Sequence, residues 1–173
     1  MGFRGRRLRM ADLPRVAHEA WSLALDLATG ASRRRLSVAA LIRDQDGRIL
    51  LAENAVPRSR WGLPGGRLER HEEPATGLAR EVSEETGLEV EVVDLRAVVV
   101  RPTLVVLVFA CHVLGGILRP APVEIAALAW VDEAEALRRL PPPGQAHLRA
   151  ALAGGSAGLL VDRWVRGARA GGG

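Results

Sequence analysis

The stretch "GLPGGRLERHEEPATGLAREVSEETGL", residues 62–88, joins a glycine-rich loop to a segment rich in glutamate. Pro74 is tolerated in the first turn of a helix, and Gly87 is a typical residue just after the last turn. We therefore expect a helix from Pro74 to about residue 86. The glycines before it allow the backbone to turn tightly and to approach other groups closely.

Three glutamates near the end of this expected helix share one face, because Glu81, Glu84 and Glu85 stand at i, i+3 and i+4. Each pair of like charges costs about 0.2–0.5 kcal/mol. The helix dipole adds to the cost, since it presents partial negative charge at this end. Both effects change sign if a divalent cation binds there, and oxygen ligands suit Mg²⁺ or Mn²⁺. The alternative interpretation is an acidic helix face in solvent.

The surrounding residues decide between these interpretations. From Gly66 to Leu88 the chain follows the pattern G-x5-E-x7-R-E-U-x-E-E-x-G-U, with U aliphatic, at every constrained position. By this motif the sequence resembles the Nudix hydrolase family, whose members hydrolyse a nucleoside diphosphate linked to another moiety. The segment "EIAALAWVDEAEA", residues 124–136, resembles a later strand and short helix of the family. The likeness covers roughly residues 36–152.

The resemblance implies a role for each residue of the motif. The expected metal ligands are the three glutamates and the backbone carbonyl of Gly66, with Mg²⁺ or Mn²⁺ as the cofactor. Glu72 is expected to pair with Arg80 and to hold the loop against the helix. Glu81 or a glutamate outside the motif, with Glu124 the best candidate, would orient or deprotonate the attacking water. The alternatives for this outer carboxylate are Asp132, Glu133 and Glu135.

The substrate is less well defined by the sequence than the metal site. Arg58 and Arg60 precede the glycine loop and are candidates for binding phosphates, and Trp61 is a candidate for contacting the substrate. The first hypothesis is a nucleoside triphosphate pyrophosphohydrolase. The alternatives are an ADP-ribose or nucleotide-sugar pyrophosphatase, and a nucleotide-sensing domain without turnover.

Composition limits the other possibilities. The chain has 173 residues and a formal charge of +4, and all 24 of its basic residues are arginine. These arginines are scattered and aromatic residues make up only 3% of the chain, so nucleic-acid binding is not expected. The one cysteine, Cys111, lies in an apolar run and is expected to be a buried structural thiol. No apolar run is long enough to span a membrane. We expect a cytoplasmic protein, with a homodimer as a possible assembly.

The order of the elements predicts an α/β fold, a Nudix-like α/β/α sandwich with a mixed sheet and an N-terminal helical extension. Two strands, residues 36–44 and 48–54, are expected to form a hairpin through a turn at Gly47. The remaining expected elements are a helix over 11–29, a loop over 55–66, strands over 88–100, 103–114 and 124–132, and helices over 133–140 and 145–153. The predicted domain organisation has three parts. An N-terminal helical extension over 1–35 precedes a Nudix-like domain over 36–155, and a C-terminal segment with a disordered tail follows over 156–173.

Overall fold

The computed structural model of the chain describes residues 35–55, 60–101, 103–153 and 158–161. The expected helix over 11–29, Arg58 and most of the C-terminal tail lie outside these residues. Among the described residues, no helix has the length and apolarity needed to cross a membrane. The predicted boundaries at 35 and 155 stay predictions.

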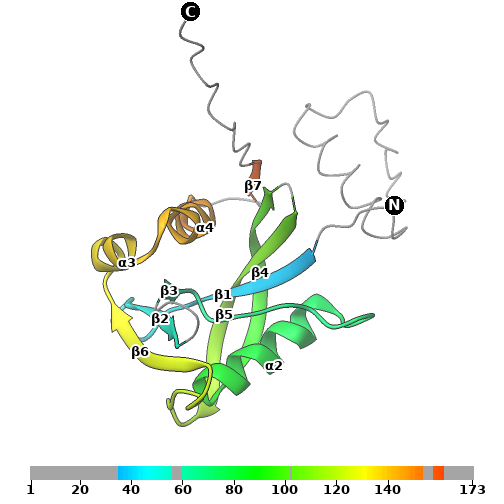
Figure 1. Cartoon of the computed structure of the whole chain (residues 1–173). Helices are drawn as coiled ribbons and strands as arrows, with labels where there is room; N and C mark the ends of the chain where they lie inside the picture. Colours follow the sequence, from blue (N-terminus) through cyan, green and yellow to red (C-terminus); the bar gives the residue numbers. More distant parts are fainter. Residues whose placement is uncertain (1–34, 56–59, 102, 154–157, 162–173) are drawn as a thin grey trace, which may run out of the picture. The chain divides into compact units, whose positions relative to one another are not determined.

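The strands form two sheets (Figure 1). A four-stranded mixed sheet has the order β1 (Arg35–Ile42), β5 (Leu104–Gly116), β4 (Leu88–Arg101), β7 (Gly158–Val161). In it, β4 is antiparallel to β5, whereas β1 runs parallel to β5 and β7 parallel to β4. A three-stranded antiparallel sheet has the order β3 (Arg60–Gly62), β2 (Ile49–Asn54), β6 (Ile125–Val131). The predicted mixed sheet is therefore present.

The predicted hairpin of the first two strands is wrong. The turn forms with Gly47 at φ 78°, as expected, but only an isolated bridge from Arg43 to Ile49 joins the two strands. The reason is that both edges of β1 are occupied by other parts of the chain. One edge pairs with β5, and the glycine loop lies along the other, where Val38 N–H donates to Gly66 and Ala40 N–H donates to Pro64.

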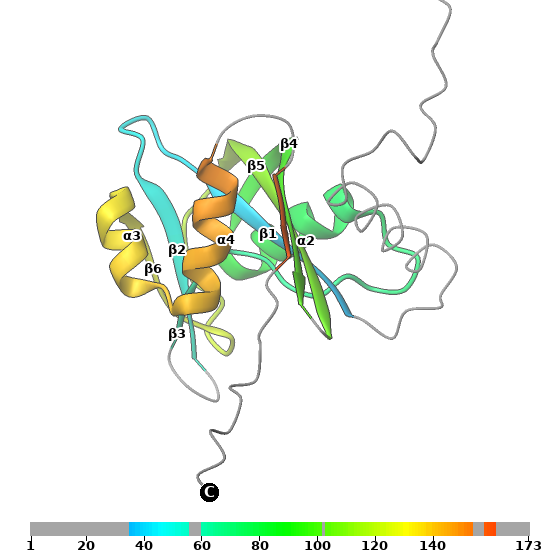
Figure 2. The same ribbon diagram turned by 90° about the horizontal axis from the view of Figure 1, so that it is seen from above.

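Helices cover both faces of the four-stranded sheet (Figure 2), with α2 (Pro74–Thr86) on one side and α4 (Pro142–Leu152) on the other. The short helix α3 (Glu133–Arg139) precedes α4. Alternate residues of β1 enter two hydrophobic cores: Ala39 and Leu41 pack with α3 and α4, whereas Val38 and Ala40 pack with α2. This arrangement is the predicted α/β/α sandwich.

Three smaller differences from the sequence expectations concern two short strands and the start of a helix. The expected loop over 55–66 contains the short strand β3, which pairs with β2. Helix α4 begins at Pro142, inside the run of prolines that was expected to precede it, because proline is tolerated in a first turn. Strand β7 was not predicted, and its pairing with β4 brings part of the segment beyond 155 into the sheet.

Candidate active site

Helix α2 is held at both ends by caps that are local in sequence. The Glu73 side chain accepts a hydrogen bond from Thr76 N–H at 2.9 Å, and Gly87 adopts φ 71° with its N–H donating to the Ser83 carbonyl. The predicted bounds of the helix are confirmed. Leu78 and Val82 are fully buried against the sheet, which fixes the rotation of the helix about its axis.

This rotation gives the three glutamates different environments. The Glu84 side chain is 58% exposed and that of Glu81 is 17% exposed. Glu85 is only 9% exposed, and its carboxylate accepts a hydrogen bond from Gly65 N–H at 2.8 Å. The acidic face is therefore a gradient from solvent into the protein, so the interpretation as a solvated helix face fails for Glu81 and Glu85.

The glycine loop contains glycines where its backbone lies close to other groups, namely at Gly65 and Gly66. Gly65 has φ 139°, a conformation that side chains rarely allow, and lies against the backbone of Val38. At Gly66 a methyl group would overlap the Glu81 carboxylate. The Gly66 carbonyl accepts a hydrogen bond from Val38 N–H at 2.9 Å, and a carbonyl oxygen keeps a second lone pair for another partner.

Arg80 sits at the centre of a carboxylate network. It makes the predicted pair with Glu72 through two hydrogen bonds, Nε to Oε1 at 2.9 Å and Nη2 to Oε2 at 3.0 Å. Its Nη1 also donates to Glu81 at 3.0 Å and to Glu84 at 3.1 Å, contacts that the sequence did not predict. One guanidinium therefore balances three carboxylates, and negative charge remains in excess.

The pKa values follow this distribution of charge. The hydrogen bonds that Arg80 donates to Glu72 hold the pKa of Glu72 at about 2, and the same contacts raise the pKa of Arg80. Burial raises the pKa of Glu81 in spite of its contact with Arg80. Burial also raises the pKa of Glu85 to about 7, with smaller contributions from the charges of the neighbouring acids, which are Glu81, Glu124 and Glu84.

Of the candidates for an outer carboxylate, Glu124 is the one whose charge acts on Glu85. Its backbone carbonyl accepts a hydrogen bond from Ala55 N–H, and the loop before it is tied to α2 by Ala121 N–H donating to the Glu85 carbonyl. The alternatives have other partners: Asp132 caps α3, Glu133 faces Arg43 at 3.8 Å, and Glu135 binds the two arginines of α3.

The donor set suits a hard divalent cation, because it consists of carboxylate oxygens and a backbone carbonyl in a site with excess negative charge. Their positions are not those of an assembled metal centre. In the described part of the chain, no three His, Cys, Asp or Glu side chains gather closely enough to hold a metal ion. Arg80 instead engages Glu81 and Glu84, of which Glu84 is the exposed one.

Two of the three candidates for substrate binding, Arg60 and Trp61, lie on β3, beside the glycine loop. Arg60 is exposed and Trp61 is partly buried, with one ring face covered by the guanidinium of Arg139 at 5.0 Å from the ring centroid. Arg139 was not predicted, since nothing in its local sequence connects it to β3. Cys111 is buried and its pKa is raised to about 12 by burial, as expected of a structural thiol.

Comparison with known proteins shows which family this chain resembles in sequence. Residues 33–153 match the family model described as "NUDIX domain". The chain is 42% identical to a "MutT-like protein" of Streptomyces ambofaciens over 115 aligned residues. The alignment covers 65% of this chain and 73% of that protein. The chain is 35% identical over 97 residues to "Putative 8-oxo-dGTP diphosphatase 2" of Mycobacterium tuberculosis, covering 50% of this chain and 66% of that protein.

A solved structure of an ADP-ribose pyrophosphatase from Streptococcus suis is also similar. It superposes with a TM-score of 0.57 at 26% identity, over 74% of this chain and 98% of that one. The glycine loop and α2 lie inside the segment that matches the family model.

Proposed function

Because this chain belongs to the Nudix hydrolase family, we propose that it is a divalent-metal-dependent nucleoside triphosphate pyrophosphohydrolase. The names of two relatives, a MutT-like protein and a putative 8-oxo-dGTP diphosphatase, support this choice of substrate class. Mg²⁺ or Mn²⁺ is the proposed cofactor, since the available donors are all oxygen atoms.

The observation that carries the proposal is the buried carboxylate of Glu85. A glutamate that is 9% exposed, next to other acids and with its pKa raised to about 7, is unfavourable unless the site has a use for concentrated negative charge. Cation binding would supply that use. A purely structural role would be served better by an apolar residue at this position.

We assign the chain's own residues as follows. The carboxylates of Glu81, Glu84 and Glu85 and the Gly66 carbonyl would hold the ions, whose chemistry when bound is to neutralise phosphate charge and to lower the pKa of water. Glu81 or Glu124 would accept the proton of the attacking water. The remaining pair has a positioning role: Glu72 holds the Arg80 guanidinium through two hydrogen bonds, which keeps the loop next to α2.

On the substrate side, Trp61 and Arg60 would contact the nucleotide from β3, together with Arg58 from the segment before it. Trp61 is partly buried against the core and the guanidinium of Arg139 lies over its ring, so the part of the ring that stays exposed would make this contact. The exposed guanidinium of Arg60 is suited to a terminal phosphate through paired hydrogen bonds.

The second candidate function is hydrolysis of ADP-ribose or a nucleotide sugar, which the likeness to an ADP-ribose pyrophosphatase favours. A domain that senses nucleotides without turnover is the third. It is disfavoured because each carboxylate of the motif is present, and two of the three proposed metal ligands, Glu81 and Glu85, are mostly kept out of solvent.

A substrate panel separates these candidates. The full chain is incubated with Mg²⁺ or Mn²⁺ and with dGTP, 8-oxo-dGTP, ADP-ribose or a nucleotide sugar, and the products are identified by phosphorus NMR. Pyrophosphate and a nucleoside monophosphate from a triphosphate would support the first function. Turnover of ADP-ribose or the sugar alone would favour the second, and tight binding without any product would favour the third.

A further inference from the structure

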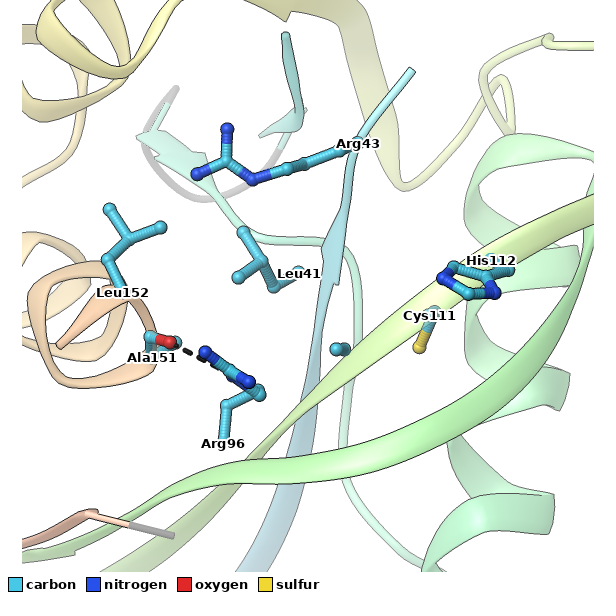
Figure 3. Close-up of a pocket in the computed structure, with 8 residues that line it drawn as sticks. Leu41, Arg43, Arg96, Cys111, His112, Ala151 and Leu152 are labelled. Atoms are coloured by element: carbon cyan, nitrogen blue, oxygen red, sulfur yellow. Dashed lines mark hydrogen bonds between the residues drawn. The ribbon is translucent and has the colours of Figure 1, made fainter. Parts of the chain in front are cut away.

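A cavity of about 270 Å³ lies beside β1, β5 and α4 (Figure 3). Leu41 and Ala151, which line it, belong to the core that includes α3 and α4, whereas Cys111, which also lines it, belongs to the core that includes α2. None of its lining residues is a candidate for the active site. They are Leu41, Arg43, Arg96, Ala110, Cys111, His112, Ala151 and Leu152.

The cavity combines an apolar wall with two guanidinium groups. Leu41 and Leu152 provide apolar side chains, and Figure 3 shows the heads of Arg43 and Arg96 on the same side of β1 as these leucines. The arginines come from different elements, since Arg43 follows β1 and Arg96 lies in β4. Tertiary structure therefore brings together two cations that are far apart in sequence.

Each guanidinium keeps donor capacity for a ligand. Arg96 donates Nε–H to the Ala151 carbonyl at 3.2 Å and Nη1–H to Asp94 at 3.3 Å, and its Nη2 has no partner among the described residues. Arg43 donates Nη1–H to the Gly47 carbonyl, and its Nη2 lies 3.8 Å from Glu133, beyond hydrogen-bonding distance.

The neighbouring acids compete only weakly for these arginines. Asp94 and Glu133 have side chains that are each 55% exposed. Ion pairs of this exposure and length contribute at most about 1 kcal/mol. A ligand oxyanion that forms paired hydrogen bonds with a guanidinium, beside a surface from which water is partly excluded, makes a stronger contact.

We propose that this cavity binds a small organic anion, with a carboxylate or phosphate between Arg43 and Arg96 and a short apolar part against Leu41 and Leu152. The volume lies just below the range of about 300–1,000 Å³ that is usual for sites of drug-sized ligands. The ligand is therefore smaller than a nucleoside triphosphate, and the site is separate from that for the substrate. The proposal does not depend on the proposed function.

The test uses the full-length, ¹⁵N-labelled protein titrated with phenyl phosphate, benzoate and inorganic phosphate and followed by backbone NMR. We expect saturable shifts of the amides of Ala110, Cys111 and Leu152 with the two aromatic anions. Whichever of these two anions binds more tightly shows whether the cavity prefers a phosphate or a carboxylate. Inorganic phosphate should bind more weakly than phenyl phosphate, because it lacks the apolar part.

Two variants complete the experiment. Arg43→Gln, at a partly exposed side chain, should weaken binding of the better anion about tenfold, the loss expected for a charge-assisted hydrogen bond. The matched control is Arg138→Gln on α3, which should leave the affinity unchanged. Absence of saturable shifts at the cavity, equal affinity in Arg43→Gln, or equal loss in the control would each overturn the proposal.

Discussion

Two arginine–carboxylate clusters on helices of this protein differ in their balance of charge. On α3, Glu135 binds both Arg138 and Arg139, so that two cations surround one anion on a mostly exposed surface. On α2 the ratio is reversed, since Arg80 alone contacts three carboxylates and a fourth, Glu85, is buried nearby.

The comparison teaches how a structural cluster can be told from a functional one. In the α3 cluster, two arginines bind the single carboxylate of Glu135. The hydrogen bonds from Arg139 and Arg138 lower the pKa of Glu135. In the α2 cluster the pKa values of Glu81 and Glu85 are raised, because burial and mutual repulsion disfavour their charged forms. Negative charge that the protein itself does not neutralise indicates a site built for an external cation.

The largest expected effect comes from removing one charge of the α2 cluster. Glu84→Gln should lower the rate of nucleotide hydrolysis by at least about 100-fold, because the proposed metal ligand would lower the activation barrier by several kcal/mol. The rate is measured with the best substrate at saturating Mg²⁺, and Mn²⁺ binding is measured by calorimetry. Glu91→Gln, an exposed glutamate of β4, is the control and should leave both unchanged. Full activity of Glu84→Gln would show that Glu84, like the charged residues on α3, has no role in hydrolysis.

The next effect concerns stability in the presence of a chelator. The pKa of Glu85 is about 7 in the folded protein against an ordinary 4.5, so the native state takes up a proton that the unfolded chain releases. The free energy of unfolding of the metal-free protein should therefore fall as the pH rises from 4.5 to 7 and stay low above pH 7. Glu85→Gln should abolish this loss and be roughly 1–3 kcal/mol more stable than the wild type at pH 8, with little difference at pH 4.5.

Denaturant unfolding at the two pH values measures this difference, with Glu91→Gln again as the control. The amide of the variant keeps an acceptor for Gly65 N–H, so the comparison isolates the charge. Addition of Mg²⁺ at pH 8 should stabilise the wild type and not the variant. Equal stability of wild type and Glu85→Gln at pH 8 would remove the electrostatic distinction between the two clusters.

A third effect tests the packing around the Glu72–Arg80 pair. Alanine is normally better than glycine within a helix by about 1 kcal/mol. At Gly77 the sign should reverse, because a methyl group would meet the Leu68 side chain and the Glu72 carboxylate at 2.7 Å. We expect Gly77→Ala to be destabilised by roughly 1–2 kcal/mol through overpacking.

Gly144→Ala in α4 is the matched control for this substitution. Its nearest neighbour is the flexible side chain of Leu140 at 3.0 Å, so the gain in helix propensity should offset the contact. Thermal and urea unfolding of both variants give the comparison. If Gly77→Ala were more stable than the wild type, the Glu72 side chain would have to move away from the added methyl group at little cost.

The smallest effects belong to the α3 cluster. Arg138→Gln should change the free energy of unfolding by less than about 0.5 kcal/mol, since its side chain is 67% exposed. Arg139→Gln should cost about 0.5–1 kcal/mol, because it also removes the cation–π contact with Trp61. Denaturant unfolding compares the two, and a shift in tryptophan fluorescence is expected for Arg139→Gln only. A larger loss for Arg138→Gln would reverse this order.

Much of the candidate site was predictable because its information is local. The bounds of α2 follow from Pro74 and Gly87, and the shared face of the glutamates follows from the helical repeat. The Glu72–Arg80 pair came from the resemblance to a family motif. The reason for a glycine at position 77 was not predictable in this way, because the side chains of Leu68 and Glu72 that would meet a methyl group there are placed beside it by the tertiary structure.

The amino-acid sequence by itself determined the helices of the described residues, most strands and the acidic face of α2, since caps and hydrophobic periodicity act over a few residues. Tertiary structure alone decided that β1 pairs with β5 and not with β2, and that Glu85 is buried while Glu84 is exposed. The physical reason is that edge occupancy and burial depend on segments distant in the chain, here the glycine loop and the strand β5, whose positions no local pattern encodes.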